Sequence, residues 1–217
     1  DQAIELLEEA ITEEEGDDIP LLLLKSRALH RNLETEEAGK VLRLVISDHP
    51  ADPRPYLERG ILRREDGDLD DAIEDFRAAL DRSGSEIEGR IQRLLADALF
   101  LRGSQGREKI LEETAFDNVK NEWERDLAEA EERYESLSTT TVNTLELRRR
   151  ALCLFRLGRY AECIQLCENA QEDERIAAFT ELEALIFQLH GDFSKAADRF
   201  KWLIQNHQKS PQFLLKY

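Results

Sequence analysis

The sequence has no methionine, only five prolines and three cysteines, and no long apolar run. A helix that crosses a bilayer needs roughly 18 consecutive apolar residues, so the short run at 21–24 predicts no membrane insertion. The scarcity of proline and of β-branched runs, with many helix formers, predicts an all-α chain. Because methionine is missing altogether, we expect the chain to be part of a longer protein or complex.

The three cysteines, Cys153, Cys163 and Cys167, are too few and too apolar in setting for a disulfide framework. Cys163 and Cys167 are one helical turn apart and would suit a shared metal, but no histidine or acid at ligand spacing completes the set. We therefore predict buried, reduced thiols, no metal and no cofactor. Reduced thiols and missing signal segments favour a cytoplasmic location, with an organelle interior as the alternative.

The sequence has few basic residues relative to its acidic ones. The chain has 30 lysines and arginines against 47 acids, a net charge of -17. Such a charge disfavours a generic nucleic-acid binder, so we expect no DNA partner.

Catalytic motifs are also missing. The sequence has no glycine-rich phosphate loop, no nucleophile elbow and no H-E-x-x-H motif. Its histidines, His30, His49, His190 and His207, are scattered along the chain. The sequence therefore predicts that the protein is not an enzyme.

What the chain does contain is a repeated helical hairpin, clearest over residues 55–80. One short amphipathic helix covers about 54–64, and Gly67 supplies a turn. A second helix carries Ala72, Phe76 and Ala79 on one face. A hairpin of this kind cannot bury its apolar face alone, so it needs stacked copies.

The copies recur with a period near 34 residues. The small residues Ala3, Ala38 and Ala72 are 35 and 34 positions apart, and Cys163 and Ala196 are 33 apart. Three turn glycines each precede such a position by five residues: Gly67, Gly158 and Gly191. The aligned copies contain Tyr56, Gly60, Ala72, Phe76 and Ala79; then Leu147, Ala151, Leu154, Cys163, Cys167 and Ala170; then Ala184, Phe187, Ala196, Phe200 and Leu203.

In period and in these positions the chain resembles the tetratricopeptide repeat superfamily. The resemblance implies a right-handed superhelical α-solenoid of antiparallel helix pairs, and a protein-protein interaction module or scaffold. We expect a single solenoid over 1–217, divided into a preceding second helix (1–18), repeat 1 (19–52), repeat 2 (53–86), an irregular repeat 3 (87–143), repeat 4 (144–176), repeat 5 (177–210) and the start of a further or capping helix (211–217).

The middle repeat departs from the pattern, because Ala72 and Cys163 are 91 residues apart where two repeats would take about 68. Residues 90–103 predict a first helix, but 104–114 do not match a second one. A long helix over about 116–137 follows instead, with a narrow apolar stripe. We interpret it as an extended second helix that packs on its neighbours, or as a partner or dimer seam. The stripe is formed by Phe116, Val119, Trp123, Leu127, Ala130, Tyr134 and Leu137.

In this family the first helices line the concave surface, and here the first helices are rich in arginine. The resemblance thus implies a ligand groove formed by Arg27, His30, Arg31, Arg54, Arg64, Arg90, Arg93, Phe100, Arg148, Leu152, Phe155 and Arg156. Arginine among apolar side chains suits carboxylates, because its guanidinium is a planar two-pronged donor. We expect the groove to bind an acidic or C-terminal segment of a protein partner.

Three alternatives remain at this point. In the first, the arginines pair with acids of neighbouring helices and only stabilise the solenoid. In the second, the chain is a structural segment that self-associates through the apolar stripe of residues 116–137. RNA binding is a third hypothesis, which the net charge opposes.

Overall fold

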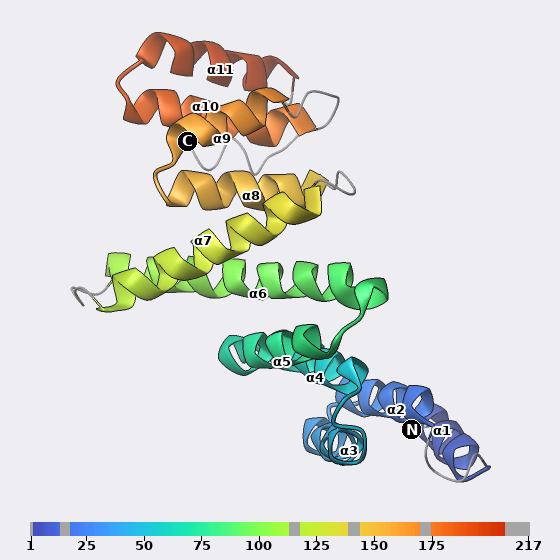
Figure 1. The fold of residues 1–217 in the computed structure, drawn as a ribbon. Coiled ribbons are helices and arrows are strands. Elements are labelled where there is room, and N and C mark those ends of the chain that lie inside the picture. Colours follow the sequence, from blue (N-terminus) through green and yellow to red (C-terminus); the bar gives the residue numbers. More distant parts are fainter. Residues whose placement is uncertain (1, 14–17, 113–117, 139–143, 170–174, 207–217) are drawn as a thin grey trace. The chain divides into compact units, whose positions relative to one another are not determined.

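The computed structural model describes residues 2–13, 18–112, 118–138, 144–169 and 175–206, and all the secondary structure in these ranges is helical (Figure 1). Its contacts divide the chain into two compact units, Asp1–Arg102 and Gly103–Tyr217. The all-α class is confirmed. A single superhelix and the repeat boundaries given above stay predictions.

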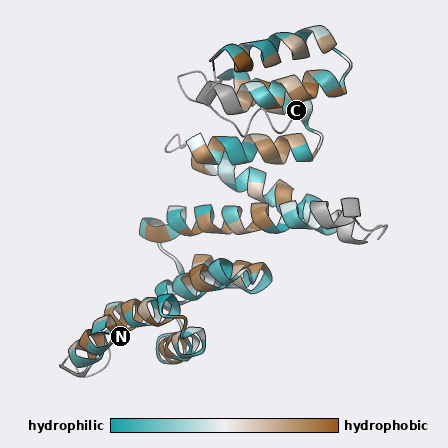
Figure 2. Ribbon diagram, turned by 180° about the vertical axis from the view of Figure 1, so that it is seen from behind, coloured by the Kyte–Doolittle hydropathy of each residue, from teal (hydrophilic) through white to brown (hydrophobic). Residues whose placement is uncertain are grey.

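The first unit is a series of short helices joined by tight turns. Two helix pairs pack most closely, α2 with α3 and α4 with α5, and α1 packs on α2. The helices are α1 (Gln2–Glu13), α2 (Ile19–Arg31), α3 (Thr35–Asp48), α4 (Pro53–Asp66) and α5 (Leu69–Arg82), followed by the start of α6 (Ser85–Glu112). Figure 2 shows apolar and polar residues interspersed along the helices, as amphipathic helices require.

Local sequence signals explain where the helices begin. The Asp18 carboxylate accepts a hydrogen bond of 3.0 Å from the backbone N–H of Leu21, and Pro20 lies in the first turn of α2. Asp52 caps α4 in the same way, at 2.8 Å from the N–H of Arg54. A carboxylate at this place satisfies backbone donors that have no partner inside the helix.

The turns within the pairs share one backbone conformation. Gly67, Gly158 and Gly191 have φ values of 91°, 74° and 76°, the left-handed region in which glycine has no steric penalty. These three turns are as the sequence predicts. The α2–α3 turn differs, because Leu33 takes the same conformation with φ 66°.

The second unit begins inside α6 and continues with helices that pack in sequence order. α7 packs on α8, α8 on α9, and α10 on α8, α9 and α11. The helices are α7 (Asn118–Ser138), α8 (Thr144–Arg156), α9 (Tyr160–Asn169), α10 (Arg175–Leu189) and α11 (Phe193–Asn206). One core cluster joins α8, α9 and α10 through Leu147, Ala151, Leu154, Cys163, Cys167, Phe179, Leu182 and Ile186.

The predicted end of a first helix at Gly103 is wrong, because α6 continues to Glu112. A Cβ atom added at Gly103 would lie 3.0 Å from Cγ of Leu127 and from the carbonyl oxygen of Trp123, and one at Gly106 would lie 3.1 Å from Cβ of Trp123. These glycines let α6 approach α7 closely. They serve helix packing, not helix termination.

The long helix predicted over about 116–137 is present as α7. Phe116 lies outside the described residues, and so does the side chain of Val119. Leu127, Ala130 and Tyr134 have no exposed surface, and Trp123 is half-buried against α6. The buried members of the stripe thus pack inside the second unit, where no partner can reach Leu127 or Tyr134.

Candidate partner-binding surface

On α2, two of the predicted groove residues are tied to α4. Arg27 donates to both carboxylate oxygens of Glu58, with Nε–Oε1 at 2.7 Å and Nη2–Oε2 at 2.5 Å. The Glu58 side chain is only 5% exposed. The hydrogen bonds to Glu58 raise the pKa of Arg27. Because the buried Glu58 carboxylate needs a cation beside it, the main role of Arg27 is to stabilise the fold and not to bind a partner.

His30 lies at the end of α2 and faces two acids of α4. Its Nε2 is 2.8 Å from Oδ1 of Asp66, and its Nδ1 is 3.8 Å from Oε2 of Glu65. Arg54 is held by the carboxylate that caps its own helix, with Nη2 at 2.5 Å from Oδ2 of Asp52. The pKa of Asp52 is lowered, chiefly by the hydrogen bond from Arg54.

Other predicted groove residues of the first unit remain available. Arg31 and Arg90 are exposed and Arg64 is half-buried. Within the described part of the chain, none of these three guanidinium groups has a hydrogen bond or ion pair. Arg93 and Phe100, in contrast, each interact with other residues of the chain. The structure therefore separates the predicted arginines into engaged and available ones.

Two further arginines of α4, outside the predicted groove, meet one buried acid. Arg59 donates to Asp75 with Nη2–Oδ1 at 2.7 Å, and Arg63 with Nη1–Oδ2 at 2.7 Å. The Asp75 side chain is 4% exposed. The four-residue spacing of the arginines, opposite an acid beside Phe76, is the sequence signal for this cluster.

In the second unit the predicted groove residues lie on α8. Arg148 is exposed and has no hydrogen bond or ion pair to any described residue. Leu152 and Phe155 are partly buried against the core cluster of α8, α9 and α10. Arg156 donates to the Ser104 hydroxyl of α6. The ring of Phe155 lies 5.8 Å from that of Tyr160.

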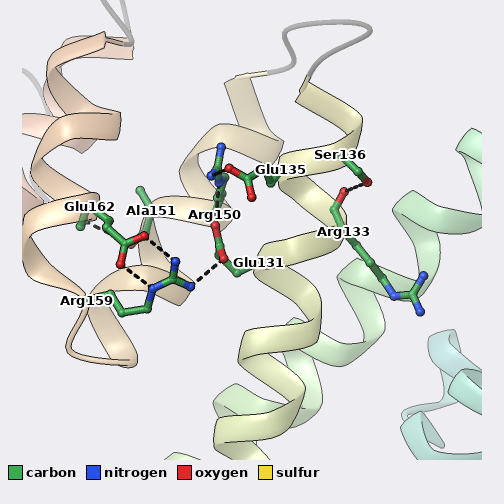
Figure 3. Close-up of polar contacts among 9 residues, drawn as sticks. Glu131, Arg133, Glu135, Ser136, Arg150, Ala151, Arg159 and Glu162 are labelled. Atoms are coloured by element: carbon green, nitrogen blue, oxygen red, sulfur yellow. Dashed lines mark hydrogen bonds and ion pairs between the residues drawn. The ribbon is translucent and has the colours of Figure 1, made fainter.

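A second buried acid with two arginines lies beside this surface (Figure 3). Glu131 of α7 accepts from Nε of Arg150 at 2.8 Å and from Nη1 of Arg159 at 2.8 Å. Each arginine also has an acid of its own, since Arg150 bonds Glu135 and Arg159 bonds Glu162. The bond from Arg159 lowers the pKa of Glu162.

An open hollow of about 710 Å³ lies between α7 and the α8–α9 turn. It is lined by Glu124, Arg125, Ala128, Leu157 and Arg159. The guanidinium group of Arg159 already pairs with Glu131 and Glu162. The hollow thus has a mixed, largely balanced wall and no convergent reactive groups.

Reactive chemistry is weak in the described residues. The cysteines are buried free thiols. Burial raises the pKa of Cys153 to about 12, which keeps it a thiol and a poor nucleophile. No set of three or more His, Cys, Asp or Glu side chains in the described ranges is placed to hold a metal ion. Among those same residues, no helix is both long and apolar enough to span a bilayer.

Comparison with known proteins agrees with this architecture. The family model described as tetratricopeptide repeat matches residues 57–108. No curated protein sequence matches the chain.

Several solved structures share the fold. YrrB, described as a TPR protein with an unusual peptide-binding site, aligns with a TM-score of 0.66 and 16% identity over 95% of this chain and 94% of its own. TTC0263, a thermophilic TPR protein of Thermus thermophilus, aligns at 0.53 and 15% over 90% and 95%. An IFIT1 monomeric mutant with Gppp-AAAA aligns at 0.64 and 12% over 94% of this chain but 45% of IFIT1. At these identities the likeness is one of fold.

Proposed function

Residues 57–108 are tetratricopeptide repeat sequence and the chain has the fold of TPR proteins, and from this premise we propose that it is a non-catalytic interaction module. It binds a segment of a partner protein on first helices, with one surface formed by α2, α4 and the start of α6 in the first unit and another by α8 in the second. The segment is acidic, or ends in a carboxylate that an arginine receives. We place the module in the cytoplasm, because its cysteines are free thiols.

One observation carries this proposal. Arg31, Arg64, Arg90 and Arg148 lie on first helices and keep their guanidinium groups unpaired within the described residues, although the chain has 47 acids. In so acidic a protein, four arginines that pair with none of the described acids are available for an outside carboxylate. YrrB, a TPR protein with a peptide-binding site, shares the fold, which supports the same class of ligand.

The alternatives are less well supported. Self-association through the α7 stripe conflicts with the complete burial of Leu127 and Tyr134. IFIT1 was solved with Gppp-AAAA, but the net charge of -17 here disfavours the binding of phosphate backbones. The proposal that the arginines only stabilise the fold holds for Arg27 and Arg54, and it does not account for Arg64 or Arg90.

Charge reversal tests the proposal. Short peptides rich in Asp and Glu, with free and with amidated C-termini, are titrated against the 217-residue chain by fluorescence anisotropy. We expect Arg64→Glu, Arg90→Glu and Arg148→Glu each to weaken binding about tenfold, because an attractive contact becomes a repulsive one. Loss of affinity on amidation would identify the terminal carboxylate as the recognised group.

Arg43→Glu is the matched control. Arg43 is exposed on α3, a second helix, and also has no ion pair to a described residue. It changes the net charge by the same amount as the other variants. Equal weakening by Arg43→Glu would mean that binding is nonspecific, and unchanged binding by all three first-helix variants would reject the proposed surface.

A further inference from the structure

Leu33, in the α2–α3 turn, combines two unusual properties. Its φ of 66° places it in the left-handed region, where it is alone among the described residues other than glycine. Its side chain is also 90% exposed, the most exposed large apolar side chain among the described residues. At the turns of α4–α5, α8–α9 and α10–α11 the chain uses glycine for this conformation.

The leucine is costly at this position and gives the fold nothing in return. A side chain with a Cβ atom is disfavoured at positive φ, because the Cβ approaches the following carbonyl oxygen. A side chain so exposed contributes almost no buried apolar surface. Glycine would remove the cost without loss of packing. Strain retained without an internal contact points to a contact outside the chain.

The surroundings of Leu33 indicate what would contact it. Glu36 and Glu37 are bound by Lys40, at 3.5 and 2.7 Å, and Glu34 accepts from the side chain of Asn32. Arg31 is two residues away, exposed, and has no ion pair to a described residue. Arg31 is therefore the cation beside the leucine that is left for an outside carboxylate; the acids of this turn keep their charge, with Lys40 shared between Glu36 and Glu37.

We propose that Leu33 is a partner-contacting residue that determines specificity. It extends the binding surface from α2 onto the α2–α3 turn. The bound segment then has a large apolar side chain next to the carboxylate that Arg31 receives. This inference rests on the proposed binding of an acidic segment, and it adds the apolar requirement.

The test separates the side chain from the strain. Leu33→Ala removes the side chain and keeps the strained backbone, whereas Leu33→Gly removes both. The probe is a set of short acidic Asp/Ser peptides, in which one leucine is moved through successive positions, together with the leucine-free parent. We expect the wild-type chain to bind the best leucine-containing peptide about three- to tenfold more tightly than the parent.

Both variants should lose this preference and bind the parent normally. Leu33→Gly should also raise the Tm by about 2–4 °C, while Leu33→Ala leaves it near the wild-type value. Leu44→Ala is the control, because Leu44 is 65% exposed on a regular helix, α3, and should change neither reading.

Three results would overturn the inference. Either the wild-type chain shows no preference for leucine, or Leu33→Ala retains it, or Leu44→Ala abolishes it equally. These outcomes leave the binding of acidic peptides intact. If the wild-type chain binds no acidic peptide at all, the proposed function itself fails, and the apolar requirement fails with it.

Discussion

In each unit a buried carboxylate lies between two arginines, but the arginines come from different helices. Asp75 of α5 takes both Arg59 and Arg63 from its pair partner α4. Glu131 of α7 takes Arg150 from α8 and Arg159 from the start of α9. The first cluster closes a single helix pair, and the second ties a long helix to the pair that follows. Neither cluster includes Arg64 or Arg148.

The comparison predicts the largest effect at Asp75. Asp75→Asn keeps the shape of the side chain and removes its charge. Among the described residues, Arg59 then has no ion pair, and Arg63 keeps only its contact with Asp71 at 3.4 Å. We expect a loss of about 3 kcal/mol in the free energy of unfolding, measured by urea denaturation. Asp70→Asn is the control, because the Asp70 side chain is 85% exposed and its ion pair with Arg102 contributes about 0.5 kcal/mol or less.

Glu131→Gln should cost less, about 2 kcal/mol, although it also removes a buried acid from two arginines. Arg150 and Arg159 keep Glu135 and Glu162, so neither cation is left without an acid. Urea denaturation of both variants side by side measures the difference. A loss at Glu131 equal to or above that at Asp75 would show that the outer acids contribute nothing.

Close packing behind the Asp75 cluster gives the next prediction. A Cβ atom added at Gly60 would lie 2.7 Å from Cε1 of Phe76 and 3.2 Å from Cβ of Asp75. Gly60→Ala should therefore destabilise by about 1–3 kcal/mol, because Phe76 is fully buried and cannot move away. Gly89→Ala, where nothing lies within 4 Å on α6, should instead stabilise by a few tenths of a kcal/mol up to about 1.

The smallest expected effect is a pair of opposite pH slopes. Arg54 lowers the pKa of Asp52 below 3.8. The interaction of the Asp52 carboxylate with Arg54 therefore stabilises the fold above that pH, and this stabilisation is lost as the pH falls further. Burial raises the pKa of Glu183 above 4.5, against the opposing charge of Arg199. Folded Glu183 thus binds its proton more tightly, and stability declines as pH rises from about 4.5 through the raised value.

Urea denaturation between about pH 3 and 7 checks both slopes. Asp52→Asn should lower stability by a constant amount in the higher range and remove the share of the low-pH loss that Asp52 causes. Glu183→Gln should remove the decline above about pH 4.5. A wild-type pH profile that neither substitution alters would contradict the assignment of these two carboxyl groups.

Much of the fold could be predicted because it depends on local signals. Gly67, Gly158 and Gly191 mark turns by their backbone freedom, and Asp18 marks a helix start by its capping oxygen. The same reasoning failed at Gly103, since a glycine that ends a helix and one that admits a neighbouring helix are identical in sequence. The neighbour, Trp123, lies on another helix.

The candidate surface was harder to predict for a related reason. An arginine on a first helix can reach a buried acid or remain exposed, and the sequence shows only the arginine. Arg27 and Arg64 look equivalent until Glu58 is found opposite Arg27. Leu33 stands five residues before Ala38, where the other turns have glycine, but a leucine there gives no sign of a left-handed backbone; only its backbone angle reveals it.

The uninterrupted course of α6 has a practical consequence for proteolysis and fragment design. Arg102 and Gly103, where the two units meet in sequence, are consecutive helical residues with no loop between them. Proteases cut most readily at exposed loop tips, so the native chain should resist cleavage at this point. A fragment intended to isolate either unit must therefore carry the whole of Ser85–Glu112, or it will end in a broken helix.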